Sequence, residues 1–290
     1  KEIHPFYQDI PMEKLKCAKF INTHRAAHSL GTLGGGNHFI ELAKDEAEAY
    51  YLIIHSGSRH FGLEVAKHYQ KIAFETHQRG GISEKDLIAN LKAQGREKEI
   101  PKTVAALKKI QPPIPKDLAW LEGENLADYL NDMSIAQTYS VINRRAMADL
   151  LIRKMKLKVD ESFTTIHNYI DLKNQILRKG SISAQKGEKV LIPMNMRDGS
   201  LLAIGKGNSE WNYSAPHGAG RLMSRTQAKN SLTLSDFKKS MVGIYSTSIN
   251  QSTLDEAPSA YKPMESIRSQ IGDTVEIIAH LKPVYNFKAA

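Results

Sequence analysis

The sequence predicts an α+β protein in which mixed β-sheets and peripheral helices surround a central basic cleft. Short apolar runs at residues 51–55 and 189–193 indicate buried strands. Residues 125–155 instead repeat apolar side chains at helical spacing. The 290 residues are 41% hydrophobic, which is ample for a core, and the formal net charge of +9 favours a polyanionic partner such as nucleic acid.

The composition also limits location and organisation. No apolar run approaches ~18 residues, so no membrane span is expected, and the first residues lack the pattern of a secretory signal. Cys17 is the single cysteine, which excludes an internal disulfide and favours a reducing, cytoplasmic location. We expect residues 1–290 to form one domain with a peripheral insertion at 83–123. Because the first residue is not methionine, we also expect this domain to be incomplete at its N-terminus.

The first half of the chain places two histidines at strand-like segments. A glycine run at 34–36 leads into a strand, where alternation predicts that Asn37 and Glu41 share one face and His38 the other. His55 ends the next strand and is a candidate metal ligand. The turn that follows it offers candidate phosphate contacts, namely Ser56, Ser58 and Arg59.

Helices dominate the middle of the sequence. We expect one at 62–78, a short one at 84–93 inside the lysine-rich insertion, and a long one at 125–155 that is straight or broken once. The basic residues of the long helix form either a solvated face or an RNA-facing one: Arg144, Arg145, Arg153, Lys154 and Lys156.

The second half alternates strand-like runs with polar turns. A strand at 163–170 carries His167 and Asn168, which are costly to bury without partners. We then expect a basic turn at 178–184, paired strands at 189–193 and 200–205, a helix near 233–237, a loop at 255–262, a helix at 263–280 and a closing strand at 283–288.

His217 is the candidate nucleophile or acid/base group. Pro216 ends any helix before it, and two glycines after it let the backbone approach a ligand closely, so we expect a helix that begins near Arg221. Free N–H groups at a helix start, with Arg221 and Arg225 beside them, attract phosphate. By residue type alone, the three earlier histidines could converge on Mn²⁺ or Zn²⁺: His38, His55 and His167.

Several of these stretches, in this order, resemble the RtcB family of RNA-splicing ligases. The resemblance runs from about residue 29 to the C-terminus and is carried by Gly31-Thr32-Leu33-Gly34-Gly35-Gly36-Asn37-His38-Phe39-Ile40-Glu41, His55-Ser56-Gly57-Ser58-Arg59, His167-Asn168-Tyr169, Arg178-Lys179-Gly180, His217-Gly218-Ala219-Gly220-Arg221-Leu222-Met223-Ser224-Arg225 and Ala260-Tyr261-Lys262.

The resemblance implies a GTP- and Mn²⁺-dependent ligase of tRNA splicing or RNA repair. Such an enzyme joins an RNA 3′-phosphate or 2′,3′-cyclic phosphate to a 5′-hydroxyl, and His217 would carry GMP between the two steps. It also implies that His38, His55 and His167 bind manganese. The implied guanylate contacts are Asn37, His38, Phe39, Ile40, Glu41, His167, Asn168, Pro193, Met194, Asn195, Met196, Ser200, His217, Gly218, Ala219, Gly220 and Lys288.

One departure keeps two other functions open. Upstream motifs in which an Asp and a Cys of the family bind manganese are absent, and Cys17 lacks the flanking glycines of that pattern. The loop 193–196 also has Met and Asn where small residues are usual. The alternatives are a non-catalytic protein that binds RNA ends or guanine nucleotides, and a metal-dependent phosphoesterase that uses water as its nucleophile.

Overall fold

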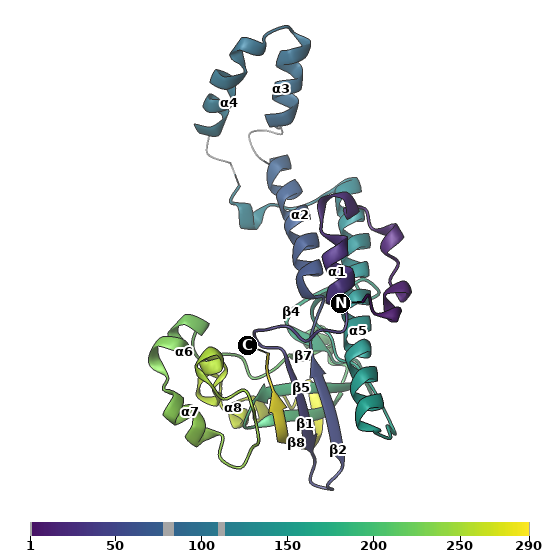
Figure 1. Cartoon of the computed structure of the whole chain (residues 1–290), viewed down its shortest axis with the longest axis vertical. Coiled ribbons are helices and arrows are strands. Elements are labelled where there is room, and N and C mark those ends of the chain that lie inside the picture. Colours follow the sequence, from purple (N-terminus) through teal and green to yellow (C-terminus); the bar gives the residue numbers. More distant parts are fainter. Residues whose placement is uncertain (1, 78–83, 110–113, 290) are drawn as a thin grey trace. The chain divides into compact units, whose positions relative to one another are not determined.

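The computed structural model describes residues 2–77, 84–109 and 114–289, and the chain divides into two compact units (Figure 1). Unit 1 comprises the residues up to 30 and 57–142, and unit 2 comprises 31–56 and the residues from 143 onward. Parts of the predicted insertion at 83–123 lie outside the described residues, as does the end of the helix expected at 62–78.

Unit 1 is helical. The helices predicted at 62–78, 84–93 and 125–155 are present in the described residues. Its helices are α1 (Thr23–Ser29), α2 (Arg59–His77), α3 (Glu84–Ala93) and α4 (Ile100–Lys109), together with most of α5 (Gly123–Met155). The predicted short helix coincides with α3, and the long helix is continuous. Three short 3₁₀ turns precede α1 at Pro5–Asp9, Met12–Lys14 and Ala18–Phe20.

A buried carboxylate ties the N-terminal turns of unit 1 to its helices. Asp132 on α5 is fully buried and accepts hydrogen bonds from the backbone N–H of Lys16 (2.8 Å) and of Cys17 (2.9 Å) and from the Tyr69 hydroxyl (2.7 Å). Burial acts to raise the pKa of Asp132, but these bonds outweigh it and the net shift is downward. The carboxylate is therefore fully engaged in holding the fold.

Unit 2 is built on two antiparallel sheets. The larger has the order β2-β1-β8-β6-β5, and the smaller has β3-β4-β7. The strands are β1 (Phe39–Lys44), β2 (Tyr50–His55), β3 (His167–Asp171), β4 (Ile176–Ser183), β5 (Lys189–Asn195), β6 (Gly199–Gly205), β7 (Ser214–Pro216) and β8 (Val275–Phe287).

The α+β class is confirmed, but the expectation of mixed sheets is wrong for the described strands. Each strand pair is antiparallel, and the one parallel contact is an isolated bridge between Tyr245 and Tyr285. Short turns join β1 to β2 and β5 to β6, so these pairs need no crossover helix. At the second turn Gly199 has a φ of 72°, and a Cβ there would lie 2.0 Å from the Leu281 carbonyl oxygen.

Four expectations for unit 2 are wrong in position or type. The segment read as a basic turn lies inside β4, and β3 begins only at His167. The helix after His217 is α6 (Arg225–Ser231), capped by Ser224, and Arg221 instead forms a bridge with Tyr261. The helix expected at 263–280 is limited to α8 (Met264–Arg268), because the β-branched run from Thr274 onward joins β8.

The remaining elements close one side of unit 2. Helix α7 (Leu234–Ser240), expected near 233–237, is capped by Thr233. The loop expected at 255–262 is largely 3₁₀ helix, at Gln251–Glu256 and Pro258–Ala260. Phe237, Met241 and Leu254 pack together beneath these segments. Across the described ranges, no helix is both long enough and apolar enough to cross a membrane.

Candidate active site

A cavity of about 380 Å³ in unit 2 gathers most of the residues proposed from the sequence. Those that line it are Asn37, Phe39, Glu41, Pro193, Met194, Asn195, Met196, His217, Gly218, Ala219, Gly220 and Lys288, together with the metal candidate His55. The other candidates are not among its lining residues: His38, Ile40, His167, Asn168 and Ser200. The volume is in the range of small-molecule sites.

Glu41 lines this cavity with a carboxylate that is only partly satisfied. Strand β1 alternates, so Phe39, Glu41 and Ala43 are buried on one face, whereas Asn37, which was expected to share the face of Glu41, precedes the strand and is exposed. The Asn286 amide donates to Glu41 Oε2 at 2.7 Å, whereas Oε1 is buried without a partner. Burial raises the pKa of Glu41 to about 7, against the hydrogen bond from Asn286 and the charge of Lys288. Such a group is suited to accept hydrogen bonds from a ligand.

His217 enters the cavity from the smaller sheet. It follows β7, its backbone N–H donates to the Gly180 carbonyl at 3.3 Å, and Gly180 lies against its ring. The next residue must be small, because a Cβ on Gly218 would lie 2.8 Å from the Pro193 carbonyl oxygen. Burial, and then the charge of Lys179, lower the pKa of His217. The imidazole is thus held neutral, with a lone pair available for nucleophilic attack.

The three other candidate histidines and His217 form a row of neighbouring rings. Successive ring centroids lie 6.0 Å apart from His38 to His55, 5.3 Å from His55 to His167, and 5.0 Å from His167 to His217. Burial, and then the neighbouring His167 and His38, lower the pKa of His55 to about 3. Burial, and then His217, lower that of His167 to about 4.

This row fits a borderline divalent cation in donor type. Metal-binding imidazoles must be neutral, and His167 Nδ1 is buried without a partner. His38 Nδ1 contacts the Leu33 carbonyl at 2.8 Å, which orients that ring as outer partners of metal ligands commonly do. Among the described residues, however, no group of three or more His, Cys, Asp and Glu side chains is arranged so that it could hold a metal ion. The chemistry fits, but these side chains do not complete a coordination sphere.

Some polar candidates have structural contacts instead. The Ser56 hydroxyl donates to the Leu33 carbonyl and accepts from Asn143, so it fastens the strand end. Asn168 accepts from the Gly180 N–H at 2.7 Å and thereby supports the segment beside His217. The candidates Ser58 and Arg59 belong to unit 1.

The long helix presents its basic residues unequally. Arg145, Arg153 and Lys154 are exposed, as is Lys156 just after the helix, which fits both a solvated and an RNA-facing surface. Arg144 is half-buried, and it donates to the Ser56 carbonyl (3.1 Å) and to the Thr164 hydroxyl (2.9 Å). The prediction that Arg144 lies on the solvated face of the helix is therefore wrong. Helical periodicity could not identify it, because the segments that cover it come from elsewhere in the sequence.

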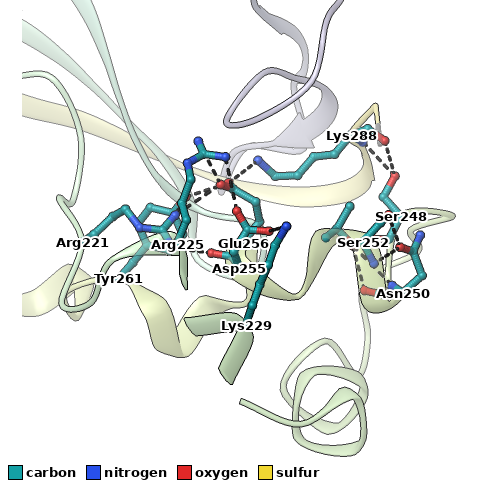
Figure 2. Close-up of polar contacts among 11 residues, drawn as sticks. Arg221, Arg225, Lys229, Ser248, Asn250, Ser252, Asp255, Glu256, Tyr261 and Lys288 are labelled. Atoms are coloured by element: carbon teal, nitrogen blue, oxygen red, sulfur yellow. Dashed lines mark hydrogen bonds and ion pairs between the residues drawn. The ribbon is translucent and has the colours of Figure 1, made fainter. Parts of the chain in front are cut away.

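A charged cluster around Glu256 forms another part of the cavity lining, and we refer to it as the charged wall (Figure 2). Arg221, Arg225 and Lys288 approach the buried carboxylate of Glu256, and Tyr261 donates to it. Two of these, Glu256 and Tyr261, were not proposed as site residues. The adjacent acidic pair at 255–256 was a weak signal, because such pairs also occur at 45–46 and 160–161.

Comparison with known proteins identifies the family of this chain. The family model described as tRNA-splicing ligase RtcB matches residues 9–289. The chain belongs to the RtcB family. It is 31% identical over 288 residues to the RNA-splicing ligase RtcB of Escherichia coli K12, a match that covers 93% of this chain and 63% of that relative.

Archaeal members of the RtcB family match over a similar extent. The tRNA-splicing ligase RtcB of Aeropyrum pernix is 29% identical over 314 residues, with 90% of this chain and 59% of the relative covered. That of Thermococcus kodakarensis is 24% identical over 305 residues, with coverage of 90% and 59%. The chain therefore spans about three fifths of the length of these RtcB relatives.

Proposed function

We propose that the cavity binds a guanine nucleotide and that His217 becomes covalently guanylylated, as the first step of GTP- and Mn²⁺-dependent RNA ligation. The main support is the pairing, in one cavity, of a neutral histidine with a buried carboxylate oxygen that has no partner. Guanine presents adjacent N–H donors, which suit the Glu41 carboxylate, while the basic wall suits phosphates.

In the first step a nitrogen of the His217 imidazole attacks the α-phosphorus of GTP. An N–P bond forms, the bond from the α-phosphorus to the bridging oxygen breaks, and pyrophosphate leaves with that electron pair. The proton on the other ring nitrogen then passes to water, so that the phosphoramidate is neutral at the imidazole. The lowered pKa of His217 keeps the attacking nitrogen unprotonated beforehand.

In the later steps an oxygen of an RNA 3′-phosphate attacks the GMP phosphorus and His217 departs. The 5′-hydroxyl of the second RNA end then attacks the activated 3′-phosphorus and releases GMP. A 2′,3′-cyclic phosphate must first be hydrolysed to the 3′-phosphate. Bound at His38, His55 and His167, Mn²⁺ would neutralise charge on the transferring phosphoryl group. Within the chain, Gly180 and Pro193 hold the His217 segment in place.

Incubation with α-labelled GTP and Mn²⁺ tests the first step. After denaturation we expect an acid-labile, hydroxylamine-sensitive GMP adduct that maps to His217 and is lost in His217→Ala. His280→Ala is the matched control, because His280 also belongs to unit 2 but does not line the cavity, and its ring contacts the Asp198 carbonyl. This variant should keep the adduct.

The same experiment separates the two other candidate functions. GTP binding without an adduct would favour a nucleotide-binding protein without transfer activity. Release of phosphate without an adduct would favour a phosphoesterase that activates water. Either outcome would contradict guanylylation by this chain.

A further inference from the structure

Glu256 is the centre of the charged wall of the cavity. It ends the 3₁₀ helix at Gln251–Glu256, and only 3% of its surface is exposed. Its Oε2 accepts from the Tyr261 hydroxyl and from Lys288 Nζ, both at 2.7 Å. Its Oε1 lies 3.3 Å from Arg221 Nη1 and 3.5 Å from Arg225 Nη2. One carboxylate thus engages side chains from three other segments of unit 2 (Figure 2).

Lys288 is held through both its backbone and its side-chain ammonium. Its backbone N–H donates to the Ser248 hydroxyl at 2.8 Å, and its carbonyl accepts from the same hydroxyl at 2.9 Å. At the other end the ammonium donates to Glu256 and lies 5.5 Å from the centroid of the Phe39 ring. An ammonium has three donors, and the Glu256 bond uses one of them. The ammonium is therefore fixed beside the cavity with capacity for a ligand.

The cluster contains more positive than negative side chains. Asp255, 4% exposed, lies 3.2 Å from Arg225 and 3.5 Å from Lys229. With Glu256 it provides two carboxylates against two arginines and two lysines. Glu256 reduces the repulsion among these cations, and the remaining excess favours an anionic ligand.

We propose that Glu256 is a positioning residue of the nucleotide site and acts on the ligand through Lys288. The identity of the ligand as a guanine nucleotide rests on the function proposed above. If Glu256 contributed only its negative charge, it would weaken the binding of every anion, and removing that charge would strengthen anion binding. A group that positions Lys288 must have the opposite effect on a ligand that needs the lysine at one place.

Binding of GMP and of inorganic pyrophosphate, measured by calorimetry, separates these two roles. Glu256→Gln should weaken GMP binding at least about tenfold. It should leave pyrophosphate binding unchanged or tighter, because the wall becomes more positive. Glu256→Asp keeps the charge but moves the carboxylate away from Lys288 by one methylene. It should therefore also weaken GMP binding. GMP binding that is unchanged or tighter in Glu256→Gln would overturn the proposal.

A double-mutant cycle tests whether the effect passes through Lys288. Lys288→Ala should weaken GMP binding, and adding Glu256→Gln to it should change the affinity less than about twofold. If Glu256→Gln costs as much in the Lys288→Ala protein as in the unaltered one, then Glu256 acts by another route and the proposal fails.

Asp132→Asn is the matched control for loss of a buried carboxylate. Asp132 is equally buried and multiply hydrogen bonded, but it belongs to unit 1 and its partners do not line the cavity. It should lower the melting temperature and leave GMP binding unchanged. If both variants weaken GMP binding in proportion to their loss of stability, Glu256 has only a structural role.

Reactivity of Lys288 towards an acetylating reagent, mapped by mass spectrometry, needs no nucleotide. The Lys288 side chain is 5% exposed, so it should be protected in the unaltered protein and lose that protection in Glu256→Gln, though not in Asp132→Asn. If the unaltered protein binds no GMP, the proposed function fails. The acetylation of Lys288 still tests whether Glu256 positions this lysine. Unchanged protection in Glu256→Gln would overturn the positioning role.

Discussion

Asp132 in unit 1 and Glu41 in unit 2 are both buried carboxylates, but the fold uses them in opposite ways. Asp132 accepts four hydrogen bonds within unit 1, from the backbone N–H groups of Lys16 and Cys17, the Tyr69 hydroxyl and the Asn131 amide, and its pKa is lowered. Glu41 accepts one from Asn286, keeps a buried oxygen without a partner, and its pKa is raised to about 7. Burial alone therefore does not identify a functional carboxylate. The Glu41 oxygen that keeps no partner within the protein is instead the group that remains available to a ligand.

Among the variants that test this comparison, Asp132→Ala should cause the largest change in the free energy of unfolding. The variant takes the acceptor away from the backbone N–H groups of Lys16 and Cys17 and from the buried Tyr69 hydroxyl, so we expect a loss of about 4 kcal/mol in the free energy of unfolding, measured with urea. Asp149→Ala is the control, because Asp149 pairs with an exposed Arg153 on the same helix. It should cost about 0.5 kcal/mol. Equal losses in the two variants would remove the structural role assigned to Asp132.

Glu41→Gln should cause the next largest change in the free energy of unfolding, and this change should stabilise the protein. The unfolded chain ionises this carboxyl near pH 4.5, whereas the folded protein keeps the proton until about pH 7. Between these values the folded state binds more protons, so the stability of the unaltered protein falls as pH rises. Glutamine does not ionise, so the variant does not lose stability as the pH rises. At pH 8 it should be more stable than the unaltered protein by about 3 kcal/mol in the free energy of unfolding.

The same variant should lose nucleotide affinity while it gains stability. We expect GMP to bind Glu41→Gln at least about tenfold more weakly at pH 8. GMP should also bind the unaltered protein more weakly below pH 7, where the Glu41 proton competes with the guanine donors. Calorimetry across pH 6 to 8 would measure both, and a variant that is less stable and binds GMP normally would contradict the functional reading of Glu41.

The smallest effect should come from Tyr69→Phe. It removes one of the four donors to Asp132 and leaves the ring in place, so we expect a loss of about 1 kcal/mol in the free energy of unfolding. Asp132 would also become easier to protonate, because the lost hydrogen bond helps to hold its pKa down. Urea titrations at pH 3 to 7 should therefore show the difference in stability shrinking towards acid pH. A constant difference would mean that the bond does not favour the ionised carboxylate.

The sequence by itself determined the elements whose pattern is local. Helical spacing predicted α2, α3 and α5, and the apolar runs around a glycine turn predicted the β5–β6 hairpin. The ordered motifs around His38, His55, His167 and His217 indicated the RtcB family, to which the chain belongs.

Only the tertiary structure decided which side chains share the cavity. Asn286 meets Glu41 across 245 positions of sequence, and Lys288 meets Glu256 across 32. Periodicity reports which face of an element is buried, but not which distant element covers it. The same reason explains the error at β8, where pairing with β1 and β6 outweighed a helical reading, and the error at Arg144, which distant segments cover.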